Sequence, residues 1–134
     1  MVSVIPAPWE QFSQRLMKVR TAVFVDEQGV SPDLEHDSFD EVSFHILLSK
    51  DKLDIATGRL LPDGHIGRVC VLKEFRGLGL GQMLMEALIE EAAKRNLAQV
   101  VLSSQVHALA FYEKFGFEVV SEEYLEAGIP HKEM

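Results

Sequence analysis

The sequence predicts an α/β fold of the α+β type, with a mixed sheet of about six to seven strands flanked by about four helices. Three observations support this prediction. Alternating apolar runs separated by turn residues lie between positions 42 and 72, which favours an antiparallel meander of three strands. A glycine-rich turn at 76–81 leads into a long amphipathic segment, and another apolar run follows near position 100. Such a strand–helix–strand order implies a parallel pair of strands joined by a right-handed crossover.

The chain begins with a predicted amphipathic helix. Between positions 8 and 23, apolar side chains recur at helical spacing with polar ones between them: Trp9, Phe12, Leu16, Val19 and Val23. We expect this helix to cover one face of the sheet. The pattern then breaks at Gly29 and Pro32, which predicts a loop or mostly irregular segment from 26 to 41.

The segment from 26 to 41 carries seven acids and no lysine or arginine: Asp26, Glu27, Asp33, Glu35, Asp37, Asp40 and Glu41. These acids fit either a solvated loop or an electrostatic collector for a positively charged amine. Arg59, in the middle strand of the meander, fits either a surface ion pair or recognition of a carboxylate on the acceptor. The two features therefore disagree about the charge of a substrate, unless that substrate is a zwitterion.

The later elements follow from the same kind of pattern. The meander strands are expected at about 42–48, 53–61 and 65–72. The helix after the glycine turn should end near Asn96, and its apolar face should pack on the sheet.

The C-terminal part is expected to return to the sheet. Gln99 to Ser103 reads as a buried strand, and His107 to Lys114 as a short helix. Phe117 to Val120 is then expected as a strand, with a last short strand around His131 to Met134.

Length and composition limit the classes of function. With 134 residues, the chain is expected to form one domain that spans 1–134. Its net charge of −8 opposes phosphate backbones and anionic membrane surfaces, so we expect neither nucleic acid nor membrane as a partner. No apolar run approaches the roughly 18 residues that cross a bilayer, and the start lacks a basic region, which places the protein in the cytoplasm. The single cysteine, Cys70, cannot form an internal disulfide.

The stretch Arg76-Gly77-Leu78-Gly79-Leu80-Gly81 stands where a strand meets a helix. Glycine brings bare backbone N–H groups close to a ligand, and the first helical turn offers unpaired donors and a positive dipole end, so this geometry suits a phosphate group. A dinucleotide fingerprint would need a glycine where Leu84 stands. A triphosphate-binding loop would need a lysine where Gln82 stands. Neither of those two phosphate sites fits.

The remaining pattern, R-x-x-G-x-G after Val69-Cys70-Val71, resembles the acyl-coenzyme A site of the GNAT superfamily of N-acyltransferases. A second motif, Ala108-Leu109-Ala110-Phe111-Tyr112-Glu113-Lys114-Phe115-Gly116-Phe117, follows at the interval typical of that family. Together with the element order, the resemblance covers nearly the whole chain. The segments from Arg20 to Gln28 and from Gly128 to His131 look like a small, poorly characterised bacterial branch of the family.

The resemblance implies acetyl-coenzyme A as the co-substrate, with no metal. In such a fold the third meander strand and its parallel neighbour splay apart, and the pantetheine arm of the cofactor pairs with free strand backbone in the gap. It implies an oxyanion-stabilising main-chain donor near Cys70 or Val71. The cofactor-binding residues that it implies are Val69, Cys70, Val71, Arg76, Gly77, Leu78, Gly79, Leu80, Gly81, Gln105, Phe111 and Tyr112. Gln105 takes the place where the family commonly has asparagine.

Transfer to an amine requires one group to accept a proton and another to donate one. The resemblance makes Tyr112 the acid that protonates the departing sulfur. His131 is the first candidate for the base, because unperturbed imidazole titrates near pH ~6.5. Glu27 is the alternative, as a carboxylate that holds or deprotonates a cationic amine. Cys70 reads as a buried small apolar residue and not as a nucleophile.

The function implied is an acetyl-coenzyme A-dependent N-acetyltransferase that acts on a primary amine of a small metabolite or peptide. Peptide N-terminal acetylation is an alternative that calls for an open groove. A coenzyme A-binding sensor or regulatory module without acceptor turnover is a second. A homodimer is an expectation at the level of the family alone.

Overall fold

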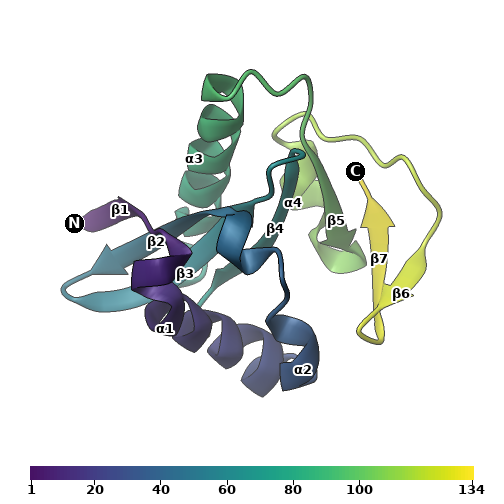
Figure 1. The fold of residues 1–134 in the computed structure, drawn as a ribbon. Helices are drawn as coiled ribbons and strands as arrows, with labels where there is room; N and C mark the ends of the chain where they lie inside the picture. The colour runs from purple at the N-terminus through teal and green to yellow at the C-terminus, as the bar shows by residue number, and fades with distance from the viewer.

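A seven-stranded sheet forms the centre of the protein, whose computed structural model describes residues 1–134 (Figure 1). Its strands lie in the order β1-β2-β3-β4-β5-β7-β6. Their bounds are β1 Val2–Pro6, β2 Phe44–Lys50, β3 Leu53–Leu60, β4 His65–Val71, β5 Val101–Gln105, β6 Tyr124–Glu126 and β7 Ile129–Glu133. The α-helices are α1 Trp9–Arg20, α2 Pro32–Glu35, α3 Leu80–Lys94 and α4 Leu109–Glu113.

The antiparallel meander β2–β3–β4 forms as predicted. Its first turn places Asp51 and Lys52 at φ of 51° and 67°, and its second places Gly64 at φ of 100°. Backbone at positive φ reverses the chain tightly, in keeping with the short connections between these strands. Along β2, Ile46 and Leu48 face one hydrophobic core and Leu47 the other, because successive side chains alternate across a sheet.

Helices cover both faces of this sheet (Figure 1). On one face, Leu16 and Val19 of α1 share a buried cluster with Leu47 and Cys70. On the other, α3 contributes its apolar side to the larger core, which also holds Ile46, Leu48 and Phe117: the buried residues of α3 in that core are Leu80, Leu84, Met85, Leu88 and Ala92. The predicted faces of both long helices are therefore confirmed.

The pair β4–β5 is parallel and the other strand pairs are antiparallel, so the mixed sheet and the fold class are confirmed. This pair is short. His65 pairs with Val101 and Ile66 with Leu102, and beyond these two rungs β4 runs to Val71 with no β5 partner. Part of the strand backbone therefore faces a gap.

Three sequence-based assignments need correction. The first helix ends as an α-helix at Arg20 and continues as a π-helix, η1 (Thr21–Glu27). The segment from 26 to 41 is not irregular throughout, because it contains α2 and the start of a 3₁₀ turn, η2 (Asp40–Val42). The segment shows no apolar periodicity because charged residues, and not apolar ones, face inwards there.

The third correction is that Phe117 to Val120 is not a strand. Phe117 is buried, but Val119 and Val120 are exposed, and a single backbone bond of 2.8 Å from the Val120 N–H to the Glu133 carbonyl takes the place of a ladder. The edge strand of this region is β6, which pairs with β7 through Tyr124 to Glu126. Strand β1, which the sequence did not reveal, pairs with β2 at the opposite edge. No helix combines the length and apolar character that spanning a membrane demands.

Candidate active site

The gap between β4 and β5 belongs to a cleft of about 1170 Å³. Its walls come from η1, β4, β5, α4 and the β6–β7 hairpin, and from residues 30–39. Val69, Cys70 and Val71 line it from β4, at the part of the strand that has no β5 partner. Strand backbone with free hydrogen-bonding groups therefore borders the cleft.

The glycine turn before α3 has the conformation that an anion cradle requires. Gly77 and Gly79 take φ of 80° and 81°, and a Cβ added at either position would meet no atom within 4 Å. None of the backbone N–H groups from residue 77 to residue 82 donates a hydrogen bond within the protein. These free donors lie at the start of a 15-residue helix, where its dipole favours negative charge. The turn therefore fits the diphosphate of a coenzyme A.

Gly81 joins the two sequence motifs. A Cβ at Gly81 would lie 3.1 Å from the ring of Phe111, so any larger residue there would push this ring away by a few tenths of an ångström. Phe111 in turn contacts Tyr112 and Phe115 edge to face, with ring centroids 5.0 Å and 5.3 Å away. This packing holds Tyr112 at the wall of the cleft.

Arg76 and Glu27 form a bidentate ion pair with both N···O distances at 2.6 Å. The Nε–H of Arg76 also donates to the Val71 carbonyl at 3.0 Å, which orients the guanidinium along the end of β4. Hydrogen bonding to Arg76 lowers the pKa of Glu27. A carboxylate with a lowered pKa is a weaker proton acceptor, which disfavours Glu27 as the base.

Gln105 bonds to Gln28 across the cleft, with its Nε2 2.8 Å from the Gln28 Oε1. The π-helix delivers Glu27 and Gln28 to this position, because its wider turns shift the register of the last helical residues. Sequence analysis singled out Gln105 and missed its partner, since an uncharged amide in a polar segment carries no distinctive signal.

Tyr112 and Cys70 both remain protonated near neutral pH. Burial raises the pKa of Tyr112 to about 12. Burial likewise raises the pKa of Cys70 to about 12. The tyrosine hydroxyl is therefore a proton donor, and the cysteine is a poor nucleophile, in agreement with its interpretation as a buried small apolar residue.

His131 lies on β7 opposite Gln105 of β5 and lines the cleft. Its Nδ1 is 2.6 Å from the Ile129 carbonyl, an acceptor that requires a proton on Nδ1. The neutral ring then presents Nε2 as its proton acceptor, 3.5 Å from Glu126. Tyr124 stacks on the imidazole at 6.1 Å between centroids.

Arginines of α1 and of the sheet hold the acidic segment in place. Arg20 pairs with Glu35 and with Asp40, the latter at 2.7 Å, and all three side chains are buried. Arg59 is also buried and contacts Asp37 at 2.7 Å and Asp40 at 2.8 Å. The solvated-loop and surface-ion-pair interpretations are therefore wrong for Glu35, Asp40 and Arg59. The two features that suggested opposite substrate charges bind each other instead.

Arg68 completes this network from a β-bulge in β4. The register between β3 and β4 shifts there, and Arg68 takes φ of 51°, which costs about 1 kcal/mol or more in a residue with a side chain. Its guanidinium donates to the carbonyls of Leu34 and Glu35 at 3.3 Å and 3.2 Å and to Asp37 at 3.2 Å. Side-chain contacts thus tie α2 to the strand that borders the cleft. Sequence analysis missed Arg68, because a bulge leaves no mark on the apolar alternation.

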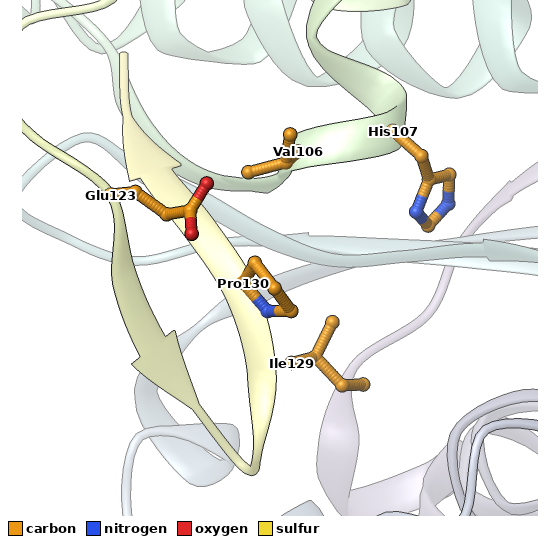
Figure 2. A pocket seen from close by; sticks show the side chains of 5 residues that line it. All are labelled: Val106, His107, Glu123, Ile129 and Pro130. Carbon is orange, nitrogen blue, oxygen red and sulfur yellow. The ribbon is translucent and has the colours of Figure 1, made fainter.

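A second, smaller hollow of about 290 Å³ lies between the 3₁₀ turn η4 (Val106–Ala108) and β7. Figure 2 shows Glu123 and His107 on opposite sides of it, with Pro130 between them. None of the three predicted catalytic side chains lines this hollow. The larger cleft is therefore the candidate active site.

The larger cleft brings together all three residues predicted as catalytic, Tyr112, His131 and Glu27. Of the predicted cofactor-binding residues, its lining includes Val69, Cys70, Val71, Arg76, Gly81, Gln105, Phe111 and Tyr112. Gly77, Leu78, Gly79 and Leu80 do not line it and form the turn at its end. The roles of these residues in binding and catalysis stay predictions.

Comparison with known proteins places the chain in a family. A sequence model of the acetyltransferase (GNAT) domain matches residues 11–134. YjcF of Bacillus subtilis strain 168, described as an uncharacterised N-acetyltransferase, is 38% identical over 138 residues, covering 100% of this chain and 98% of that protein.

Solved structures agree with the sequence match. An acyl-CoA N-acyltransferase from Pseudomonas aeruginosa superposes with a TM-score of 0.90 at 35% identity, covering 100% of this chain and 98% of that chain. Escherichia coli ElaA superposes with a TM-score of 0.88 at 34% identity, covering 99% and 97%. The resemblance found in the sequence is confirmed, and the protein is an acyltransferase. The chain belongs to the GNAT acetyltransferase family.

Proposed function

We propose that the protein is an acetyl-coenzyme A-dependent N-acetyltransferase that acts on a primary amine of a small metabolite or peptide. One observation supports the proposal most strongly. The unbonded N–H groups of residues 77–82 stand at one end of a cleft that is bordered by unpaired β4 backbone and holds Tyr112 and His131. A diphosphate site, a slot for an extended arm and two proton-transfer groups thus share one space.

The turn from Arg76 to Gly81 would hold the diphosphate through backbone donors. The backbone of Val69 to Val71 would hold the pantetheine arm as an added strand, because its β5 side is open. Arg76 keeps two N–H groups beyond those given to Glu27 and Val71, so it can donate to a phosphate without losing either partner. When bound, acetyl-coenzyme A supplies an activated acetyl thioester.

Acetyl transfer replaces the thioester C–S bond with an amide C–N bond, while the amine loses one proton and the departing sulfur gains one. Tyr112 would donate the proton to sulfur, since its hydroxyl stays protonated at neutral pH. His131 would accept the proton of the amine through Nε2, since Nδ1 is committed to the Ile129 carbonyl. Glu27 is the weaker candidate because it pairs with Arg76.

The proposal is tested by measuring coenzyme A thiol release from acetyl-coenzyme A over a panel of primary amines, with mass spectrometry of the acetylated product. Thiol release that depends on the amine supports it. Calorimetric binding of acetyl-coenzyme A with no turnover of any amine would favour the sensor module instead.

A further inference from the structure

Apart from Glu126, every aspartate, glutamate and arginine that lines the large cleft has an ion-pair partner of opposite charge within the protein. Glu27 pairs with Arg76 at 2.6 Å, and Asp37 pairs with Arg59 at 2.7 Å and with Arg68 at 3.2 Å. Glu35 pairs with the buried Arg20, and Arg68 lies 3.7 Å from it. No lysine lines the cleft.

The remaining acid of the cleft, Glu126, lies 3.5 Å from the Nε2 of His131 and is more than half exposed. It is therefore the one carboxylate in the lining whose partner is a titratable base and not an arginine. An incoming ammonium group would meet a negative charge at this point, beside the proposed proton acceptor. The site therefore has a place for the amine itself, and its other acids and its arginines already pair with each other.

Apolar side chains stand free in the same cleft. Leu34 and Phe39 line it and are 56% and 52% exposed. Phe24, Val30 and Ile129 line it as well and are partly exposed. Large apolar side chains exposed within a cleft are typical of a ligand-binding surface, because a ligand of like character removes them from water.

We propose that the acceptor is a primary amine carried on an uncharged, apolar body, such as an alkyl or aryl group, which packs against Leu34 and Phe39 while its nitrogen lies at His131 and Glu126. This inference rests on the proposed N-acetyltransferase function and narrows its substrate. A second charge on the acceptor would lose its hydration in the cleft, where every arginine and most acids are already in ion pairs. This second charge could be a carboxylate, a phosphate or another ammonium.

The test compares kcat/KM for acetylation of matched amines at saturating acetyl-coenzyme A. Hexylamine and 2-phenylethylamine represent the apolar class, spermidine the polycations, L-glutamate the amines with carboxylates, and glucosamine 6-phosphate the amines with a phosphate. The kcat/KM of the apolar amines should exceed that of each amine with a second charge by at least about tenfold. Each methylene added to a short alkylamine should raise kcat/KM by about threefold to fourfold, as expected for burial of a methylene.

Two variants test whether Leu34 and Phe39 contact the acceptor amine. Leu34→Ser and Phe39→Ser should each raise KM for 2-phenylethylamine by about fivefold or more while the KM for acetyl-coenzyme A stays within twofold, because less apolar area is buried with the amine. Val42→Ser is the matched control, since Val42 is 60% exposed in the same part of the chain and does not line the cleft. It should leave both KM values within twofold of the wild type.

The results separate this inference from the function on which it rests. Turnover of spermidine, L-glutamate or glucosamine 6-phosphate in preference to the apolar amines would overturn the inference and leave the N-acetyltransferase function standing. Equal KM values in Leu34→Ser, Phe39→Ser and the wild type would also overturn it. No turnover of any amine by protein that binds acetyl-coenzyme A would overturn both.

Discussion

At the scale of single residues, burial keeps Tyr112 and Cys70 protonated, which suits Tyr112 to the proposed role of acid. Tyr112 is enclosed by Phe111 and Phe117, at 5.0 Å and 6.3 Å between ring centroids, and this burial raises its pKa to about 12. A phenol that does not ionise at neutral pH is available as an acid over the whole physiological range.

Replacing Tyr112 by phenylalanine should lower kcat for amine acetylation by about 10²-fold, the lower end of the range for a lost general acid. The Kd for acetyl-coenzyme A should change less than twofold, because the aromatic packing is kept. Stopped-flow turnover and calorimetry measure the two quantities. Tyr124→Phe is the control, since Tyr124 does not line the cleft and the change removes only the hydroxyl that bonds to Ser103. Unchanged kcat in Tyr112→Phe would remove the acid role.

The base is tested by the pH dependence of kcat/KM. His131→Ala should flatten the acidic limb of the profile, because protonation of the base would no longer stop the reaction. Glu27→Gln should keep the acidic limb, since pairing with Arg76 lowers the pKa of Glu27 and removes it from proton transfer near neutral pH. The reverse pattern would make Glu27 the base, and two unchanged limbs would assign the proton to water.

At the scale of elements, the charged segment after η1 shows where sequence-based prediction succeeds and where it does not. The meander and α3 were predictable because apolar periodicity records which face is buried. The segment from 31 to 42 buries charged side chains. The spacing of apolar residues does not show that a carboxylate there faces an arginine. Glu35 pairs with Arg20, 15 positions earlier, and Asp37 with Arg59, 22 positions later, so only the folded chain shows the pairs.

The candidate site divides in the same way. Arg76, Gly81, Phe111 and Tyr112 were predictable because they lie in two local motifs with regular spacing. Arg68 was not, because its role depends on a bulge and on contacts to backbone carbonyls more than 30 positions away.

The charge network gives a specific dependence of stability on pH. Hydrogen bonding to Arg59 lowers the pKa of Asp37 from 3.8 to about 2. In the unfolded chain Asp37 takes up its proton near the ordinary value, so its stabilisation is complete above about pH 4 and is lost as the pH falls towards about 2.

Asp37→Asn should therefore lower the free energy of unfolding by about 1 kcal/mol at pH 7, after allowance for solvent screening of a partly exposed pair. The difference from the wild type should shrink as the pH falls from about 4 towards 2. Urea unfolding at several pH values measures it. Asp33→Asn is the control, because Asp33 is exposed and has no ion-pair partner. A difference that stays constant down to pH 2 would contradict the assignment.

At the scale of the whole molecule, a net charge of −8 must coexist with the proposed site for an anionic cofactor. The fold meets this requirement locally, because the donors of the turn from Arg76 to Gly81 act at short range and distant charges are screened beyond about 8 to 10 Å. Three acids of the segment from 31 to 42, Glu35, Asp37 and Asp40, contribute little repulsion, since they are paired with arginines. Affinity for the cofactor should thus depend on the turn far more than on total charge.

Calorimetric titration with acetyl-coenzyme A tests this claim most directly, with Gly79→Asp as the variant and Gly116→Asp as its control. Both glycines have positive φ, 81° and 92°, with open space where a Cβ would stand, but only Gly79 lies in the turn. The wild type and Gly116→Asp should bind one acetyl-coenzyme A per chain, and Gly79→Asp should bind at least about tenfold more weakly because its carboxylate would face the diphosphate. Absence of binding by folded wild type, or equal affinity in Gly79→Asp, would contradict the account.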